Sequence, residues 1–171
     1  MTEERGLSIY FSASISGGRD DAPRYAALIS SLGAFGHVLT EHIGSPGLSD
    51  GGEHGPEDHE IYARDMGWLN AADIVVAEVT TPSLGVGYEV ARAASLGKTV
   101  IALFRPDSGR RLSAMIRGNP VVRVLEYAGD DDPGDVAAKA ISLALVERGP
   151  EVARRAETGA NSETTGEDRG P

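Results

Sequence analysis

The chain has 171 residues, enough for one self-supporting core, which argues against a two-domain enzyme with a cleft between its domains. It contains no cysteine, so disulfides, thiolate metal sites and cysteine nucleophiles are excluded. Sixteen basic and 26 acidic residues give a net charge of −10, which opposes binding to a nucleic-acid polymer. The sequence shows neither a signal core nor a long apolar segment, so we expect a cytoplasmic protein with no membrane partner.

Short β-branched runs alternate with longer helix-compatible stretches, a pattern typical of βαβ units around a parallel sheet. The predicted strands cover 7–13, 37–40, 73–79, 99–104 and 121–126, and the predicted helices cover 20–32, 56–71, 83–96 and 133–146. Gly33 and Gly97 fall where a helix end favours a left-handed residue, and Pro133 falls at a helix start. We therefore expect one α/β domain over 1–147, with helices flanking a mostly parallel five-stranded sheet.

Two segments are too rich in Gly and polar residues to bury much surface. The tail 148–171 lacks apolar periodicity, so we expect it to be disordered and to have no catalytic role. The internal segment 44–55 is also Gly-rich, and we expect a mobile loop near a site.

Ligands of open parallel sheets bind at the carboxyl ends of the strands. The turn SASISGGR, residues 12–19, follows the first predicted strand, and its glycines would let backbone amides approach an anion. An ordinary tight turn explains the same residues. The turn does not match GxGxxG, so we expect no dinucleotide cofactor.

The segment TTPSLGVGYE, residues 80–89, follows the third predicted strand. Ser83 is a candidate N-cap, but Gly85 and Gly87 then fall in the first helical turns, where each costs about 1 kcal/mol relative to Ala. Bare backbone facing a ligand and close helix packing both account for these glycines. Glu89 comes next, either as a partly buried reactive carboxylate or as a surface residue favoured by the helix dipole.

Two further segments carry candidate polar groups. Asp65 shares a predicted helix face with three large apolar residues, so it needs either a structural partner or a chemical role. The segment GRRLSAMIRG, residues 109–118, combines three arginines with Ser113, which suits a phosphate but also a solvated loop.

Other known site chemistries lack their motifs. His54 and His59 are not spaced to place two ligands on one helix face, so we expect no metal. The chain has neither a P-loop nor a GxSxG elbow, and the PGGxGTxxE motif of ribonucleotide phosphoribohydrolases is missing.

Six motifs occur in a characteristic order: IYFSASISGGR, LTEH, RDMGWLNAADIVVAEVT, PSLGVGYE, LFRPDSGR and LSAMIRG. Together they resemble the 2'-deoxynucleoside 5'-phosphate N-hydrolase family, relatives of nucleoside 2-deoxyribosyltransferases. The resemblance runs from about Leu7 to Tyr127. The family turn often reads GSIRGGR, whereas Ala13 and Ser16 stand at two of these positions here.

The resemblance implies a flavodoxin-like or Rossmann-like fold and a homodimer. It implies Glu89 as nucleophile, Asp65 as acid/base and Tyr10 as the residue that orients Glu89. Ser83 and Ser113 correspond to phosphate-binding serines, the latter contributed to the neighbouring subunit's site. The implied substrate-binding positions are Ser14, Ile15, Gly17, Gly18, Arg19, His42, Ser83, Gly85, Ser113 and Met115.

The implied reaction is hydrolysis of the N-glycosidic bond of 2'-deoxynucleoside 5'-monophosphates through a covalent glycosyl-Glu intermediate, with no cofactor. Two alternatives stay open. A deoxyribosyltransferase would pass the sugar to an incoming base, and a nucleotide-binding sensor would bind without turnover.

Overall fold

The computed structural model describes residues 6–15, 21–45 and 55–148. The tail 148–171, for which disorder was expected, lies outside this part of the chain except for Arg148, which caps the helix that ends at Glu147 and pairs with Asp73 at 3.2 Å. Gly17, Gly18 and Arg19 of the predicted nucleotide turn also lie outside it, as does most of the predicted loop 44–55. No helix in the described ranges is long and apolar enough to cross a membrane.

The five strands form one sheet whose pairings are all parallel. Its order is β2-β1-β3-β4-β5, the flavodoxin-like order of doubly wound α/β folds. This confirms the predicted fold class and places the topological switch point at the carboxyl ends of β1 and β3. The strands are β1 Ser8–Ser12, β2 His37–Val38, β3 Ile74–Glu78, β4 Thr99–Phe104 and β5 Val122–Glu126.

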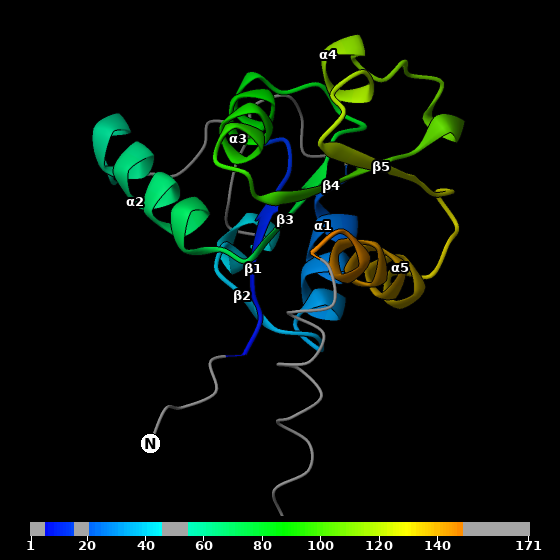
Figure 1. The fold of residues 1–171 in the computed structure, drawn as a ribbon, viewed down its shortest axis with the longest axis horizontal. Coiled ribbons are helices and arrows are strands. Elements are labelled where there is room, and N and C mark those ends of the chain that lie inside the picture. The colour runs from blue at the N-terminus through cyan, green and yellow to red at the C-terminus, as the bar shows by residue number, and fades with distance from the viewer. Residues whose placement is uncertain (1–5, 16–20, 46–54, 149–171) are drawn as a thin grey trace, which may run out of the picture.

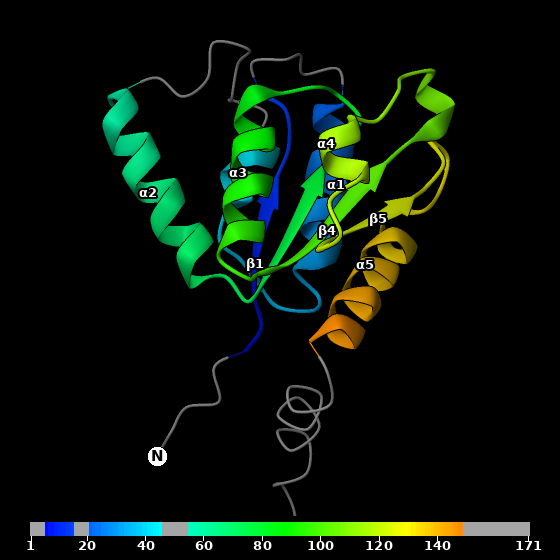
Figure 2. The ribbon, with the colours of Figure 1, turned by 45° about the horizontal axis from the view of Figure 1, so that its top comes forward.

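Helices cover both faces of the sheet, so the chain forms three layers (Figure 1). The helices α1, Ala22–Leu32, and α5, Pro133–Glu147, pack on one face, where Ile9 and Phe11 of β1 point. On the other face lie α2, Asp58–Ala71, α3, Leu84–Ser95, and the short α4, Ala114–Arg117. In the tilted view α3 lies between α2 and α4 (Figure 2).

The predicted strand 37–40 is shorter than expected and ends at Val38. Beyond this point the side chain of Thr40 forms the hydrogen bonds to β1. Its hydroxyl accepts from the Phe11 amide at 2.9 Å and donates to the Phe11 carbonyl at 2.7 Å. A side chain thus does what backbone pairing was expected to do.

Three short helical segments were not predicted: η1 Glu41–Gly44, η2 Pro106–Ser108 and α4. Each is too short to show a helical period in sequence. Gly97 has the expected positive φ of 69°, but the same expectation for Gly33 is wrong, since its φ is −58°. The chain there continues in turns, with the Gly33 amide still bonded to the Ile29 carbonyl at 3.0 Å.

Candidate active site

Glu89 on α3 is held by two hydroxyl groups from β1. Tyr10 Oη donates to Glu89 Oε1 at 2.8 Å, and Ser12 Oγ donates to Glu89 Oε2. Ser83 begins α3 as predicted, its hydroxyl accepting from the Val86 amide at 3.4 Å. The helix start therefore brings Glu89 to the carboxyl end of β1, beside the switch point of the sheet.

The surroundings of Glu89 act on its pKa in opposite directions. Burial raises the pKa of Glu89, the hydrogen bonds from Ser12 and Tyr10 lower it, and the nearby charge of Asp65 raises it, with a net upward shift. Burial and the neighbouring Glu89 charge raise the pKa of Tyr10 far above its usual range. The Tyr10 phenol consequently stays protonated and remains a hydrogen-bond donor.

Glu89 opens into a hollow of about 250 Å³ between α2 and α3, and Asp65 of α2 lines the same hollow. Arg64 grips Asp65 Oδ1 with two nitrogens, at 2.9 and 2.8 Å, and its guanidinium lies over the Trp68 ring at 4.7 Å. The structure thus brings both predicted carboxylates to one cavity. Its lining residues are Asp58, Ile61, Tyr62, Asp65, Met66, Gly85, Tyr88 and Glu89.

Gly85 borders the hollow, and the geometry argues against packing as the reason for the two helical glycines. A Cβ at Gly85 would meet only Ser83 Oγ, at 3.8 Å, and a Cβ at Gly87 would meet nothing within 4 Å. Neither glycine is therefore needed for close approach of α3 to the sheet. Of the two, Gly85 alone faces the hollow, so bare backbone there leaves room for a ligand.

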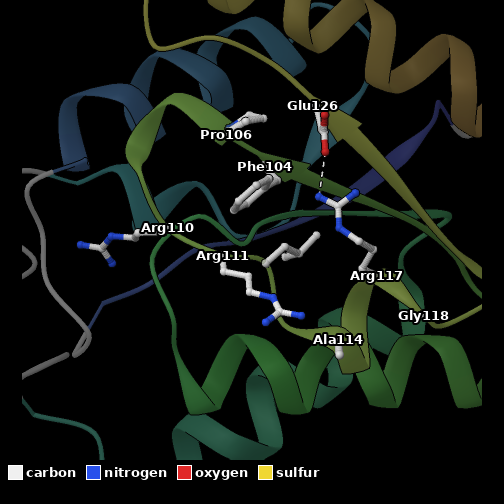
Figure 3. Close-up of a pocket in the computed structure, with 9 residues that line it drawn as sticks. Phe104, Pro106, Arg110, Arg111, Ala114, Arg117, Gly118 and Glu126 are labelled. Carbon is white, nitrogen blue, oxygen red and sulfur yellow. Dashed lines mark hydrogen bonds and ion pairs between the residues drawn. The ribbon is translucent and has the colours of Figure 1, made fainter.

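Ser113 and Met115 lie at the start of α4, away from the hollow of their own chain. Ser113 caps the helix by accepting from the Met115 amide at 3.3 Å, and Met115 is 83% exposed. The arginines of this segment line a separate pocket of about 450 Å³ (Figure 3). In that pocket Arg117 turns toward Glu126, at 2.7 Å, while Arg110 points away from both.

The other predicted binding residues lie at different places around the sheet. Ser14 is fully buried, and its hydroxyl has no partner among the described residues. Ile15 packs against the core on the α1–α5 face. His42 lies against α2, with its ring 5.5 Å from that of Trp68 and its Nε2 3.5 Å from Arg64.

Sequence reasoning missed Ser12, Arg64 and the aromatic pair at the rim of the hollow. Tyr62 and Tyr88 are joined at 3.1 Å between their hydroxyls and are both about half exposed. A strand period of two offered a signal for Ser12, because it shares a face with Tyr10. In the described part of the chain, no group of three or more His, Asp or Glu side chains is arranged to hold a metal.

A sequence profile of the nucleoside 2-deoxyribosyltransferase family matches residues 9–145. The chain belongs to this family. The resemblance drawn from the motifs is thereby confirmed, and the match includes Tyr10, Asp65 and Glu89.

Curated relatives are similar over most of their own length. A 5-hydroxymethyl-dUMP N-hydrolase of Tetraodon nigroviridis is 57% identical over 113 residues, 66% of this chain and 80% of that protein. The protein of the same name from Danio rerio is 48% identical over 128 residues, covering 73% and 90% of the two chains. The one from Homo sapiens is 46% identical over 147 residues, covering 77% and 84%.

Proposed function

We propose that the chain hydrolyses the N-glycosidic bond of 2'-deoxynucleoside 5'-monophosphates, releasing the free base and 2-deoxyribose 5-phosphate. The observation that carries this proposal is a carboxylate held by two hydroxyl donors and facing a second carboxylate across one hollow. Two carboxylates with separate roles are what glycoside hydrolysis requires. The names of the relatives support the same bond and the same class of substrate.

In the first step, a Glu89 oxygen attacks C1' of the deoxyribose as the bond to the base breaks. The electron pair of that bond leaves with the base, and an ester forms between Glu89 and the sugar. The sugar has no 2'-hydroxyl to withdraw electrons, so the positive charge that develops at C1' is less costly. An anionic Glu89 stabilises this charge, and Tyr10 and Ser12 hold the attacking carboxylate in place.

Asp65 is the proton carrier of the proposal. It lines the hollow opposite Glu89 and is oriented by the two bonds from Arg64. In the first step it delivers a proton to the departing base. In the second it takes a proton from the water that cleaves the ester, which returns both carboxylates to their starting states.

Hydrolysis is favoured over the two alternatives. A deoxyribosyltransferase would use the same ester, but each of the three relatives compared above is named as a hydrolase. A sensor would not need both Glu89 and Asp65 in one hollow. The relatives' names make 5-hydroxymethyl-dUMP the first substrate to test. As part of the proposal we place the enzyme in the cytoplasm, in line with its lack of cysteine.

The phosphate site is proposed to form between two copies of the chain. Ser83 starts α3 next to Gly85. The short helix α4, which Ser113 caps and which contains the exposed Met115, lies on the other side of α3 from α2 (Figure 2), and neither residue lines the same hollow. Leu84, at 96% exposure, lies beside Ser83 at the start of α3 and supplies an apolar contact surface. In the proposed homodimer, Ser113 of each subunit completes the site that contains its neighbour's Ser83 and Glu89.

Mixing two inactive variants tests the shared site. In a heterodimer of Glu89→Gln and Ser113→Ala subunits, one site carries both substitutions and the other carries neither. We expect refolded mixtures to regain up to about a quarter of wild-type turnover, because random pairing makes half of the dimers mixed and each has one intact site of two. Turnover that does not rise above the sum of the two parents would contradict a Ser113 that acts across the dimer.

Substituting Gly85 separates ligand space from helix stability. Gly85→Ala is expected to raise the free energy of unfolding by up to about 1 kcal/mol, since alanine is the better helix former and nothing obstructs the new methyl group. The same methyl group enters the hollow, so we expect kcat/KM to fall about tenfold. Thermal melts and initial rates measure the two effects. Gly87→Ala is the matched control, stabilising the helix without loss of activity; equal activities of the two variants would show that Gly85 leaves no room for substrate.

A further inference from the structure

The two donors that hold Glu89 come from adjacent inward positions of one strand. Tyr10 and Ser12 are two residues apart on β1, so their side chains point to the same face of the sheet. Each donates to a different oxygen of the carboxylate. Ser12 is 1% exposed, so its hydroxyl is sheltered from competition with water.

We propose that Ser12 is a positioning residue that fixes the orientation of the Glu89 carboxylate and favours its charged form. This inference rests on the proposed role of Glu89 as nucleophile. With one donor, the carboxylate plane could still turn about the bond to the side chain. With a donor on each oxygen the plane is fixed, and every oxygen keeps a second lone pair with which to attack C1'.

At the other end of β1, Ser8 also bonds to a carboxylate, that of Asp73, but the surroundings differ. Asp73 accepts from Ser8 Oγ at 2.7 Å and from the Ser8 amide at 2.9 Å, and Arg148 adds a guanidinium at 3.2 Å. Asp73 is thus a structural carboxylate neutralised by a cation. Glu89 receives neutral hydroxyls instead, and none of the described residues that line its hollow is basic.

Neutral donors suit a nucleophile better than an ion pair does. A guanidinium would stabilise the charge strongly and withdraw the electron density that attacks the sugar. Hydroxyl donors offset part of the cost of burying the charge and leave the carboxylate more reactive. Burial has the largest effect on the pKa of Glu89 and raises it. The hydrogen bond from Ser12 has the largest effect among those that lower it.

The test is the pH profile of kcat for Ser12→Ala between about pH 5 and 9. Without the Ser12 donor, less counteracts the effect of burial, so the pKa of Glu89 rises. When the solution is acidified, the variant should therefore lose activity at a higher pH than wild type does. We expect the acid limb to move up by about one pH unit, the size expected for a lost hydrogen bond to a charged group. At a pH below the wild-type limb, kcat should fall about tenfold, with KM changed little.

Two further variants make the result decisive. Ser8→Ala removes a serine–carboxylate hydrogen bond from the same strand and should lower the melting temperature without moving the acid limb. Ser12→Cys keeps a side chain of similar size with a weaker donor, so its limb should lie between those of wild type and Ser12→Ala. It also carries the test if the alanine variant does not fold.

An acid limb that stays at its wild-type position in both Ser12 variants overturns the inference, and so does an equal shift in Ser8→Ala. These outcomes are separate from failure of the proposed function. If Glu89→Gln is inactive while the limb does not move, Ser12 alone has been misassigned. If Glu89→Gln keeps its turnover, the nucleophile itself is wrong.

Discussion

Glu89→Gln is expected to lower the turnover of a deoxynucleoside monophosphate by about 10³-fold or more, as removal of a nucleophile does in other covalent enzymes. The amide has nearly the same shape as the carboxylate but does not form the ester with C1'. It can still accept a hydrogen bond from Tyr10 or Ser12, so substrate affinity should stay within a few fold of wild type. Initial rates of base release and calorimetric titration with the substrate measure the two effects.

Glu126→Gln is the control for this substitution. Glu126 is a glutamate at an exposed position outside the carboxylate hollow. Unlike Glu89, it pairs with an arginine, Arg117, at 2.7 Å. We expect its turnover to equal that of wild type. Wild-type turnover in Glu89→Gln itself would show that the ester is not on the reaction path.

Asp65→Asn is expected to reduce turnover by about 10² to 10³-fold, the usual contribution of a general acid and base. Asparagine keeps the size of the side chain but carries no proton to deliver to the base. The loss should be smaller for a substrate whose leaving group is a weaker base, because such a group needs less protonation. Rates with a pair of substrates that differ in this property measure the effect.

Asp58→Asn provides the matched control, because Asp58 lies on the same helix and lines the same hollow. Its turnover should remain within a few fold of wild type. Two results would assign Asp65 a general electrostatic role instead of proton transfer. One is an equal loss of turnover in the two variants, and the other is a loss in Asp65→Asn that is the same for both leaving groups.

The order of elements and the start of α3 follow from local chemistry that the sequence displays. Thr99–Phe104 was predicted residue for residue, because the buried part of a parallel strand, here its last five residues, appears as an unbroken apolar run. Ser83 was predicted as the cap of α3 and is the cap, so Glu89 fell in the expected helical turn. These features depend on residues that are close together in the sequence, so the sequence pattern is enough to predict them.

The contacts that build the site depend on residues far apart in the chain, and sequence patterns do not contain them. Ser12 was predicted to lie where the strand 7–13 meets the glycine turn, and it is the last residue of β1, but its bond to a carboxylate 77 positions away was not predicted. Arg64 precedes Asp65 directly, and two adjacent helical residues do not ordinarily face one another. In the folded chain the guanidinium of Arg64 lies over the Trp68 ring and also bonds to Asp65, a contact that depends on the packing of α2.

The most direct test is incubation of the purified protein with 2'-deoxynucleoside 5'-monophosphates, including 5-hydroxymethyl-dUMP, together with the matching ribonucleotides and the deoxynucleosides without phosphate. Free base is followed by chromatography, with no acceptor base added. We predict base release from the deoxynucleoside monophosphates alone, because the 2'-hydroxyl raises the cost of the transition state and the phosphate supplies remote binding energy that positions the sugar. Binding of these nucleotides without release of any base would contradict the account and make the protein a nucleotide sensor.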